Sequence, residues 1–215
     1  MENRQAVLRE SPSAGTNQAD SNPFEYEPPA WDETELRILD AAAHLLATRG
    51  IEGVTVTGLA KEARVSRPTV YRRWPGIEEI ERATLLRTTI SLFDRLGSLP
   101  CTRADIVDSI ARFSALFRED PLYRSLLERQ PELFTRYSLE RIGTSQRFML
   151  RWIATAVEAG QQDGTVRRDA PEDIAIMLLL IAQSATLSHR SVASLIGEAE
   201  LDLQLRAAVD GYLKP

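Results

Sequence analysis

Hydrophobic positions from residue 32 onward repeat with the period of an α-helix. In residues 32–49, Asp32 and Glu35 have the spacing of a capping box, and Gly50 stands where helices commonly end. One face of this helix is apolar, because side chains three or four positions apart lie together. That face contains Leu36, Leu39, Ala43 and Leu46. No convincing alternation of period two occurs, so the pattern predicts an all-α protein.

The same periodicity continues to the end of the chain. A proline or glycine separates most of the helices, as expected of residues that interrupt helical structure. The further helices are expected over about residues 55–63, 66–74, 77–96, 102–120, 131–160, 169–189 and 198–213. Residues 1–31 differ, because they are rich in Pro, Ser, Asn and Glu and have little apolar periodicity. We expect that tail to be mostly disordered.

Composition restricts the class of protein. The chain has 215 residues, 43% hydrophobic and 27% charged, with a net charge of -5, as in a soluble globular protein. Cys101 is the single cysteine, which excludes an intrachain disulfide and a cysteine-zinc cluster. The N-terminus lacks the apolar segment of a signal peptide, and the apolar run near residues 173–182 is short for a bilayer. We expect a cytoplasmic protein with no membrane span, metal or cofactor.

The stretch VSRPTVYRRWPG begins a short helix of unusual chemistry. Ser66 is a good N-cap, and Pro68 falls in the first turn, where its missing N–H costs little. Val65 and Val70 have the spacing of a hydrophobic staple. Val70 and Trp74 fall on one face, so they should anchor the helix and leave its other side in solvent.

Positive charge gathers around this helix. Residues 61–74 contain one acidic residue, Glu62, and five basic ones, a local charge of +4 in a chain of net charge -5. The basic residues are Lys61, Arg64, Arg67, Arg72 and Arg73. A charge run is often only a solvated face. Together with the preceding helix and turn, however, this one forms a helix-turn-helix, whose second helix presents its N-terminal residues to the major groove. The combination favours DNA binding.

The stretch RILDAAAHLLATRGIEGVTVTGLAKEARVSRPTVYRRWPGIEEI closely resembles the N-terminal domain of the tetracycline-repressor (TetR) family of bacterial regulators. The resemblance is dense over residues 33–82. It implies a helix-turn-helix DNA-binding domain at 32–76 and a helical effector-binding and dimerisation domain at 77–215. It also implies a homodimeric regulator, most often a repressor, that binds a palindromic operator on double-stranded DNA and is released by a small apolar or amphipathic effector.

The resemblance assigns DNA contacts to individual positions. Family members contact bases at positions matching Arg67, Pro68 and Thr69, and the DNA backbone at positions matching Thr55, Thr57, Tyr71 and Arg73. Each residue suits its role: an arginine can fork onto guanine, and hydroxyl groups can bind phosphate. Arg72 adds to the cationic face. Tyr71 either reaches a phosphate or lies partly in the core.

Two positions depart from the family pattern. Gly76 and Ile77 stand where the family usually has Ser-Lys, whose lysine binds a phosphate. One phosphate anchor is therefore missing unless Arg82 compensates. Gly58 replaces an acidic capping residue, so we expect a looser start of the second helix.

The second half of the chain contains aromatic and sulfur-containing side chains at helical spacings. Each could be ordinary core. A pocket for a small molecule, however, needs an apolar cavity with a few polar groups, and Tyr137, Trp152 and Gln183 provide polar tips. His189 either contacts a ligand or interacts with its own helix dipole. The candidate pocket residues are Phe113, Phe117, Tyr123, Phe134, Tyr137, Met149, Trp152, Met177 and Gln183.

The last two helices, at about 170–189 and 198–213, are apolar and capped. Two DNA-reading modules on a palindrome require a two-fold axis. In the family, equivalent helices form a four-helix dimer interface, so we expect a homodimer here. A buried helix within a monomer is the alternative.

Catalysis is not indicated. The two histidines, His44 and His189, lie in different predicted domains, and the common nucleophile, metalloprotease and nucleotide-binding motifs do not occur. The alternative to a ligand-released repressor is an activator, or a helical ligand-binding or interaction module whose helix-turn-helix no longer engages DNA. The absence of a lysine at Ile77 raises the last possibility.

Overall fold

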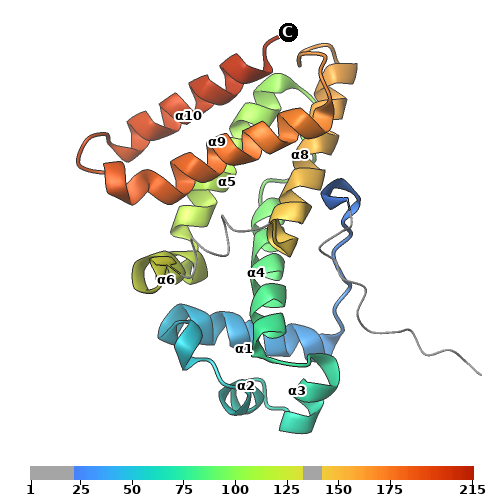
Figure 1. Cartoon of the computed structure of the whole chain (residues 1–215), viewed down its shortest axis with the longest axis vertical. Helices are drawn as coiled ribbons and strands as arrows, with labels where there is room; N and C mark the ends of the chain where they lie inside the picture. Colours follow the sequence, from blue (N-terminus) through green and yellow to red (C-terminus); the bar gives the residue numbers. More distant parts are fainter. Residues whose placement is uncertain (1–21, 133–141) are drawn as a thin grey trace, which may run out of the picture.

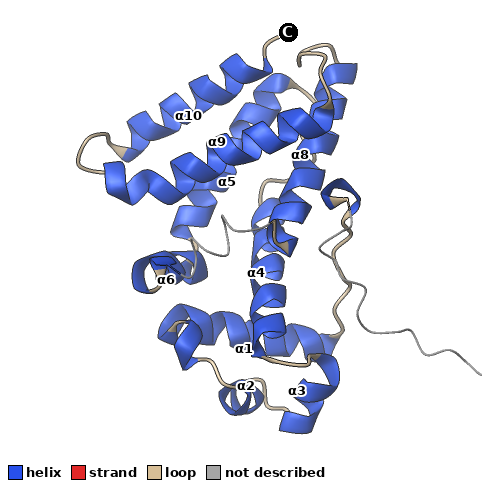
Figure 2. Cartoon of the chain, viewed as in Figure 1, coloured by secondary structure: helices blue, strands red, loops and turns tan. Residues whose placement is uncertain are grey.

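Every regular element in the described part of the protein is helical, which confirms the predicted all-α fold (Figure 2). The computed structural model describes residues 22–132 and 142–215. Within these ranges there are nine α-helices, two 3-10 turns and no strand. The N-terminal elements are η2 (Pro23–Glu25), α1 (Glu33–Arg49), η3 (Ile51–Gly53), α2 (Val56–Glu62), α3 (Arg67–Arg73) and α4 (Ile77–Asp94). The C-terminal helices are α5 (Arg103–Glu119), α6 (Pro121–Arg129), α8 (Thr144–Gln162), α9 (Pro171–Val192) and α10 (Glu198–Leu213).

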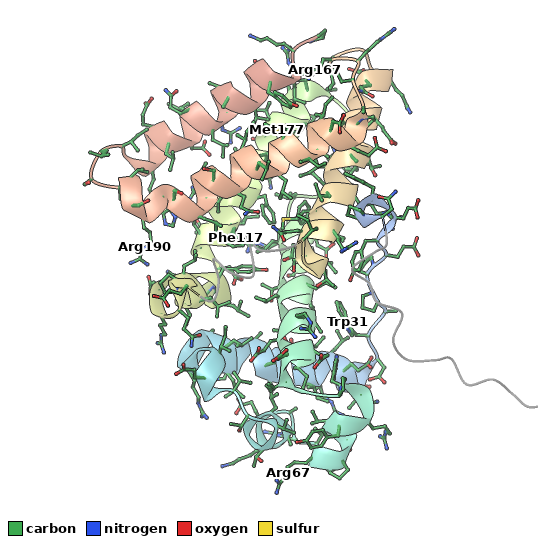
Figure 3. All side chains as sticks on the ribbon, viewed as in Figure 1. Trp31, Arg67, Phe117, Arg167, Met177 and Arg190 are labelled. Carbon is green, nitrogen blue, oxygen red and sulfur yellow. The ribbon has the colours of Figure 1, made fainter. Side chains whose placement is uncertain are left out.

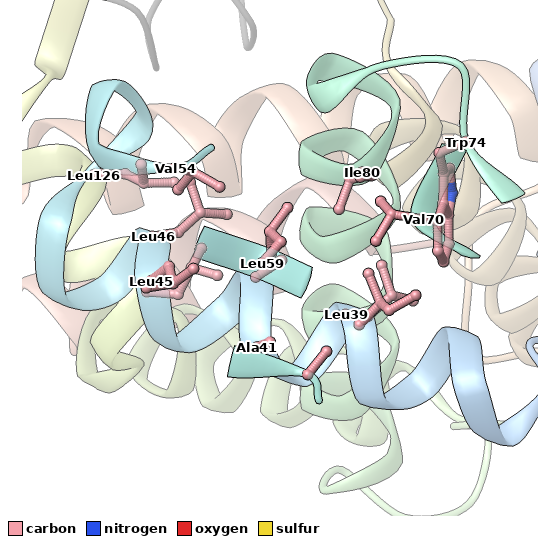
Figure 4. Packing of buried hydrophobic residues seen from close by; sticks show 14 of the residues in the cluster. Leu39, Ala41, Leu45, Leu46, Val54, Leu59, Val70, Trp74, Ile80 and Leu126 are labelled. Atoms are coloured by element: carbon pink, nitrogen blue, oxygen red, sulfur yellow. The ribbon is translucent and has the colours of Figure 1, made fainter. Parts of the chain in front are cut away.

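Helices α1, α2 and α3 form the lower end of the molecule, and α4 rises from them toward the other helices (Figure 1). Their apolar faces meet in a lower core, shown in Figure 4. Fully buried members include Leu39, Leu59, Val70 and Ile80. Removing such side chains from water is the main stabilising contribution to this end of the molecule. The lower core also takes in Phe117, Leu122, Tyr123 and Leu126 of α5 and α6, so it continues across the domain boundary expected after residue 76.

A separate upper core lies among α5, α8, α9 and α10. Ile106, Val157, Ile174 and Leu178 are buried there, and α10 contributes Leu205, Val209 and Leu213 at intervals of four residues. This spacing places the three α10 side chains on one face of the helix. The opposite face of α10 therefore remains on the surface.

The helix predicted over 131–160 is not continuous. Ile142 and Gly143 are not helical, and α8 begins at Thr144. Gly143 has an extended backbone and donates its N–H to the Gln146 side chain at 3.0 Å, which fixes the helix start there. Residues 133–141 lie outside the described residues.

The predicted start of α9, with Asp169 as the N-cap, is also wrong by one residue. Pro171 is the first helical residue, and Ala170 occupies the N-cap position without a side-chain hydrogen bond. Asp169, expected to begin the helix, instead pairs with Arg167, with 2.7 Å between Oδ2 and Nε. Proline is well placed at the first position of a helix, and here it defines the start. The last helix, α10, has the predicted bounds.

The prediction of a disordered tail over 1–31 is wrong for residues 22–31. Asn22 caps the short turn η2 by accepting a hydrogen bond from the Phe24 N–H. Phe24 then packs against the upper core, and Trp31 packs against the lower core. Composition does not reveal this order, because two aromatic anchors among polar residues barely change a tail's average hydrophobicity. Residues 1–21 lie outside the described part of the chain.

By length and composition alone, α9 could cross a membrane. Its 22 residues form one continuous helix. One face of α9 is buried in the upper core, where Ile174, Ala175, Leu178 and Leu179 pack. An apolar helix buried on one side is typical of the core of a globular protein.

Candidate DNA-binding surface and central cavity

The start of α3 has the predicted cap. Ser66 Oγ accepts the Thr69 N–H at 3.2 Å, and Pro68 lies in the first turn. Val70 is fully buried and Trp74 is nearly so, and both belong to the lower core (Figure 4). The two apolar anchors thus turn inward as predicted. Trp74 itself has left the helix and adopts an extended conformation, so the helical part of α3 is short.

The turn between α2 and α3 depends on a left-handed residue. Arg64 has a φ of 55° and follows the last turn of α2. The Val65 N–H then returns to the Ala60 carbonyl at 2.9 Å, which is the bond pattern of a glycine-type helix end. An L-residue in this conformation costs about 1 kcal/mol. An arginine occupies this position, where glycine is usual, and it adds a positive charge between α2 and α3.

The side of α3 away from the core is exposed and basic. Arg67, Pro68, Tyr71 and Arg72 are exposed there, and Figure 3 shows Arg67 at the extreme lower end of the molecule. Tyr71 is 56% exposed, which places it outside the core and answers the question left by the sequence. Thr69 is half-buried, and its hydroxyl shares a hydrogen bond of 2.8 Å with Ser66 Oγ.

Helix α2 packs against α3 (Figure 1), and its start adds two exposed hydroxyl groups, those of Thr55 and Thr57. Thr55 is the N-cap of α2, and its Oγ1 accepts the Gly58 N–H at 3.1 Å. The helix start is therefore capped by one side chain even though Gly58 cannot return a second bond. The predicted residues of the two helices are thus exposed, except for Thr69 and Arg73, which are half-buried.

Arg73 points toward the protein. Its side chain is 18% exposed, and it donates to Asp32 Oδ2 at 2.7 Å. Asp32 is the N-cap of α1, where it accepts the Glu35 N–H at 2.8 Å. That backbone hydrogen bond and the bond from Arg73 lower the pKa of Asp32. Arg73 thus connects the end of α3 to the start of α1, a role that its position in the motif did not indicate.

The start of α4 differs from the family pattern in the way that the sequence suggested. Gly76 is the N-cap and makes no side-chain hydrogen bond. Ile77 is half-buried against the lower core, so this position supplies an apolar contact in place of a cation. Arg82 pairs within α4, at 2.5 Å from Glu79 and 3.8 Å from Glu78. Its partners are therefore acidic side chains of its own helix.

A cavity of about 150 Å³ lies between α4, α5, α8 and α9. It is mostly apolar, as expected of a small-molecule site. The lining includes six residues predicted from the sequence, namely Phe113, Phe117, Tyr123, Met149, Trp152 and Gln183. Sequence reasoning missed the contribution of α4, which includes Arg82, Leu85, Thr89 and Phe93. Periodicity placed those residues on a helix but gave no signal that one face of it would border a cavity.

Aromatic rings form most of one wall. Phe93 is central, with its ring centroid 4.5 Å from that of Phe113 and 4.8 Å from that of Trp152. Phe117 stacks on Tyr123 at 4.0 Å. Aromatic pairs in such tilted and stacked arrangements stabilise the fold by more than the burial of their apolar surface alone.

Polar groups occur at a few points of the lining. The Tyr123 hydroxyl donates to the Leu85 carbonyl at 2.9 Å and lies 2.6 Å from Thr89 Oγ1. Burial of this phenol strongly raises its pKa. On the α8–α9 side, Gln146 Nε2 donates to Gln183 Oε1 at 3.0 Å. A few placed hydrogen-bonding groups in an apolar cavity provide orientation for a bound molecule.

Of the other candidates that the structure describes, neither Met177 nor His189 lines this cavity. Met177 is 42% exposed on the outer side of α9, so its assignment to the pocket is wrong. The helical phase places it about a quarter turn away from the buried Leu178. Phe134 and Tyr137 lie outside the described residues. His189 Nδ1 is 2.8 Å from the Thr186 carbonyl near the end of α9, and His189 does not line the cavity.

A buried carboxyl group lies where the lower end meets α6. Glu81 borders a small void together with Leu46, Ile51 and Leu126. Burial raises the pKa of Glu81 to about 7, and the negative charge of Glu78 adds to the shift. Sequence reasoning gave no signal for this group, because glutamate at the start of a helix is ordinarily exposed.

The outer faces of α9 and α10 carry exposed apolar side chains. Ile176, Met177 and Leu180 of α9 and Leu203 of α10 are all at least 40% exposed. The two helices pack against each other in the upper half of the molecule (Figure 1). Grouped apolar exposure of this kind marks a protein-protein contact more often than a free surface.

Comparison with known proteins identifies the family. Residues 38–84 match the family described as bacterial regulatory proteins, tetR family. An uncharacterised HTH-type transcriptional regulator of Mycobacterium tuberculosis, Rv2250c, is 37% identical over 184 residues, which cover 84% of this chain and 95% of the relative. The chain belongs to the TetR family. It is thus a transcriptional regulator with a helix-turn-helix formed by α2 and α3, and not an enzyme.

Other members are more distant. The regulator EthR of M. tuberculosis is 27% identical over 187 residues, covering 79% of each chain. The solved structure of RolR superimposes with a TM-score of 0.64 at 14% identity and covers 83% of this chain and 90% of its own. The repressor QsdR of R. erythropolis superimposes with a TM-score of 0.63 at 18% identity, covering 86% and 98%. At such identities these structures establish the fold.

Proposed function

We propose that this TetR-family regulator is a homodimeric repressor that binds a palindromic operator and is released by a small apolar or amphipathic effector. The observation that carries the DNA-binding part is the orientation of α3. Val70 and Trp74 are buried, and Arg67 is exposed beside other cations. A short helix anchored in this way can enter the major groove with its N-terminal residues toward the bases.

Within this proposal, Arg67, Pro68 and Thr69 contact base edges. Thr55, Thr57, Tyr71 and Arg72 contact the DNA backbone on either side. Arg73 would need to leave Asp32 to reach a phosphate, so we assign it to the positioning of α3. Guanine recognition by an arginine contributes about 1–3 kcal/mol of discrimination.

The proposed dimer forms through α9 and α10. A palindromic operator requires two copies related by a two-fold axis. The exposed side chains Ile176, Met177, Leu180 and Leu203 supply apolar area on one side of the upper half. Their burial against a second copy would explain why an otherwise charged surface contains them.

The proposed effector site is the central cavity. Its size and aromatic lining suit a small ring compound, and a structure of the neighbour RolR is described as a complex with resorcinol. Helix α4 borders this cavity through Leu85, Thr89 and Phe93, and it reaches the lower core through Ile80. An effector that binds better to a tilted α4 than to the DNA-bound arrangement would shift the equilibrium and release DNA.

The test is a mobility shift with the DNA fragment flanking the protein's own gene. The wild type should shift this fragment, and Arg67→Ala should weaken specific binding by about 5- to 150-fold, or ~1–3 kcal/mol. Arg37→Ala is the matched control, because Arg37 is an exposed arginine of α1 outside the α2–α3 surface. Equal affinities of wild type and Arg67→Ala for the fragment would refute the proposed register of α3.

A second candidate is a ligand-binding or interaction module that no longer engages DNA. The observation that favours it is Ile77, which supplies an apolar contact at the usual phosphate-binding position. Several phosphate contacts cause a steep loss of affinity with salt. A DNA affinity that does not change with salt concentration would support the ligand-binding or interaction module. Activation of a reporter gene by the bound protein would instead indicate an activator.

We place the regulator in the cytoplasm, where its operator would be.

A further inference from the structure

Residues 22–31, here named the N-terminal strap, are attached to both cores of the molecule. Phe24 packs against the upper core and Trp31 against the lower core. Figure 1 shows this segment running from the side of α8 down to the start of α1, on the outside of α4. The strap is therefore a second connection between the two halves, separate from α4: it continues covalently into α1 and is held to α8 by non-covalent contacts.

The upper attachment is made to α8. Arg151 Nη1 donates to the Tyr26 carbonyl at 2.8 Å and lies 3.4 Å from Glu27 Oε1. Beside these contacts is a groove lined by Tyr26, Phe148 and Trp152 among others. Trp152 also lines the central cavity. One indole ring thus separates the proposed effector site from the strap.

The lower attachment leads to the recognition helix. Trp31 is followed directly by Asp32, which caps α1 and accepts the hydrogen bond of Arg73. Arg73 is the last residue of α3. A shift of the strap at Trp31 would therefore move the carboxylate that positions the end of α3.

The segment between the two attachments is stiff. Pro28 and Pro29 have fixed φ angles, and Tyr26 before them is extended, with φ -65° and ψ 124°. Proline-rich segments behave as semi-rigid spacers. A displacement at α8 would then be passed along the strap instead of being absorbed by it.

We propose that the strap couples the central cavity to the recognition helix, through Trp152 and Arg151 at one end and through Asp32 and Arg73 at the other. The inference rests on the proposed DNA-binding and effector sites. With the strap attached, α3 is held in one orientation, and binding to DNA then requires less ordering. Release of the strap from α8 loosens that orientation and weakens DNA binding.

The experiment compares Arg151→Ala with wild type in the full chain. Binding of the labelled promoter fragment is measured by fluorescence anisotropy, and hydrogen exchange is measured on the free protein. Arg151→Ala should weaken DNA binding by about fivefold, near the lower limit of ordinary couplings between sites. It should also speed exchange in the first turn of α1 and in α3. Phe24→Ala leaves the Arg151 contacts intact and removes the apolar anchor of the strap, and it should have the same effects.

Arg167→Ala is the matched control. Arg167 also donates to a backbone carbonyl, that of Tyr212, and pairs with a carboxylate, but it lies at the opposite end of the molecule from Arg67 (Figure 3). It should leave DNA binding and the exchange of α3 unchanged. Equal effects of Arg151→Ala and Arg167→Ala, or none for Arg151→Ala, would overturn the proposal.

A double-mutant cycle tests whether the two attachments act in series. Asp32→Asn keeps a good N-cap on α1 but removes the charge that holds Arg73. If the strap acts through Asp32, Arg151→Ala should have little further effect on DNA binding in the Asp32→Asn background. If the double variant instead loses DNA affinity by the product of the two single losses, the two attachments act independently and not in series. If wild type itself fails to bind the fragment, the proposed function fails, and the exchange of α3 still decides whether the strap positions it.

Discussion

Charged side chains near α4 take roles that their local sequence does not indicate. Arg73 belongs to a basic run, yet it holds Asp32 at the start of α1. Glu81 belongs to an acidic helix start, yet it is buried beside Leu46 and Leu126. In both cases the partner comes from a distant part of the sequence, so the surroundings exist only in the folded chain.

The buried Glu81 should make stability depend on pH. Its pKa is raised from 4.5 to about 7, so the folded protein holds this proton more tightly than the unfolded chain does. The unfolding free energy should therefore fall as pH rises from about 4.5 to 7, and the loss should remain above that range.

Glu81→Gln removes the ionisation and should raise the unfolding free energy at pH 8 by about 1–3 kcal/mol, with a smaller effect at pH 5. Urea denaturation at the two pH values measures the difference. Glu158→Gln, at an exposed position of α8, is the control and should shift neither value. Equal effects of Glu81→Gln at both pH values would contradict the assignment.

At the scale of single elements, α3 is short and depends on its cap and its two anchors. It contains seven helical residues, too few to be stable alone in water. Its start was predictable because Ser66, Pro68 and the valine pair are local signals. The interruption before α8 was not predictable, because Gly143 is fixed there by a hydrogen bond to one side chain, Gln146.

Ser66→Ala should lower the unfolding free energy by about 1 kcal/mol, because the Thr69 N–H then loses its acceptor. DNA affinity should fall as well, since the first turn of α3 carries the proposed base contacts. Thermal unfolding and the mobility shift measure the two effects. Ser194→Ala, in the exposed turn after α9, serves as the control and should change neither. An unaltered melting temperature for Ser66→Ala would mean that the cap contributes little.

At the scale of the whole molecule, the two cores are connected by α4, by α5 and by the N-terminal strap. The cavity borders the first two of these, and Trp152 brings it next to the third. The outer faces of α9 and α10 point away from both cores. This arrangement separates the proposed reading, sensing and dimerisation surfaces while it keeps them mechanically connected.

The proposed dimer makes a prediction at this scale. Leu180→Glu places a charge on the exposed apolar side of α9, where Leu180 is 51% exposed. Burying that charge in an interface is unfavourable, so the dissociation constant of the dimer should rise by about 100-fold, or ~3 kcal/mol. Analytical ultracentrifugation measures the dissociation constant. Leu195→Glu makes the same change at an 84% exposed position between α9 and α10 and should leave the dimer intact. Similar constants for both variants would exclude this face as the interface.

The sequence by itself determined the all-α class, the order of the helices, and the inward-facing Val70 and Trp74 of the helix-turn-helix. These features depend on local caps, on turn residues and on helical periodicity, all of which act between near neighbours in the chain. Only the tertiary structure decided that Arg73 binds Asp32, that α4 borders the cavity and that residues 22–31 lie along α8. Those contacts join residues that are far apart in the sequence, and a local sequence pattern does not specify which distant surfaces pack together.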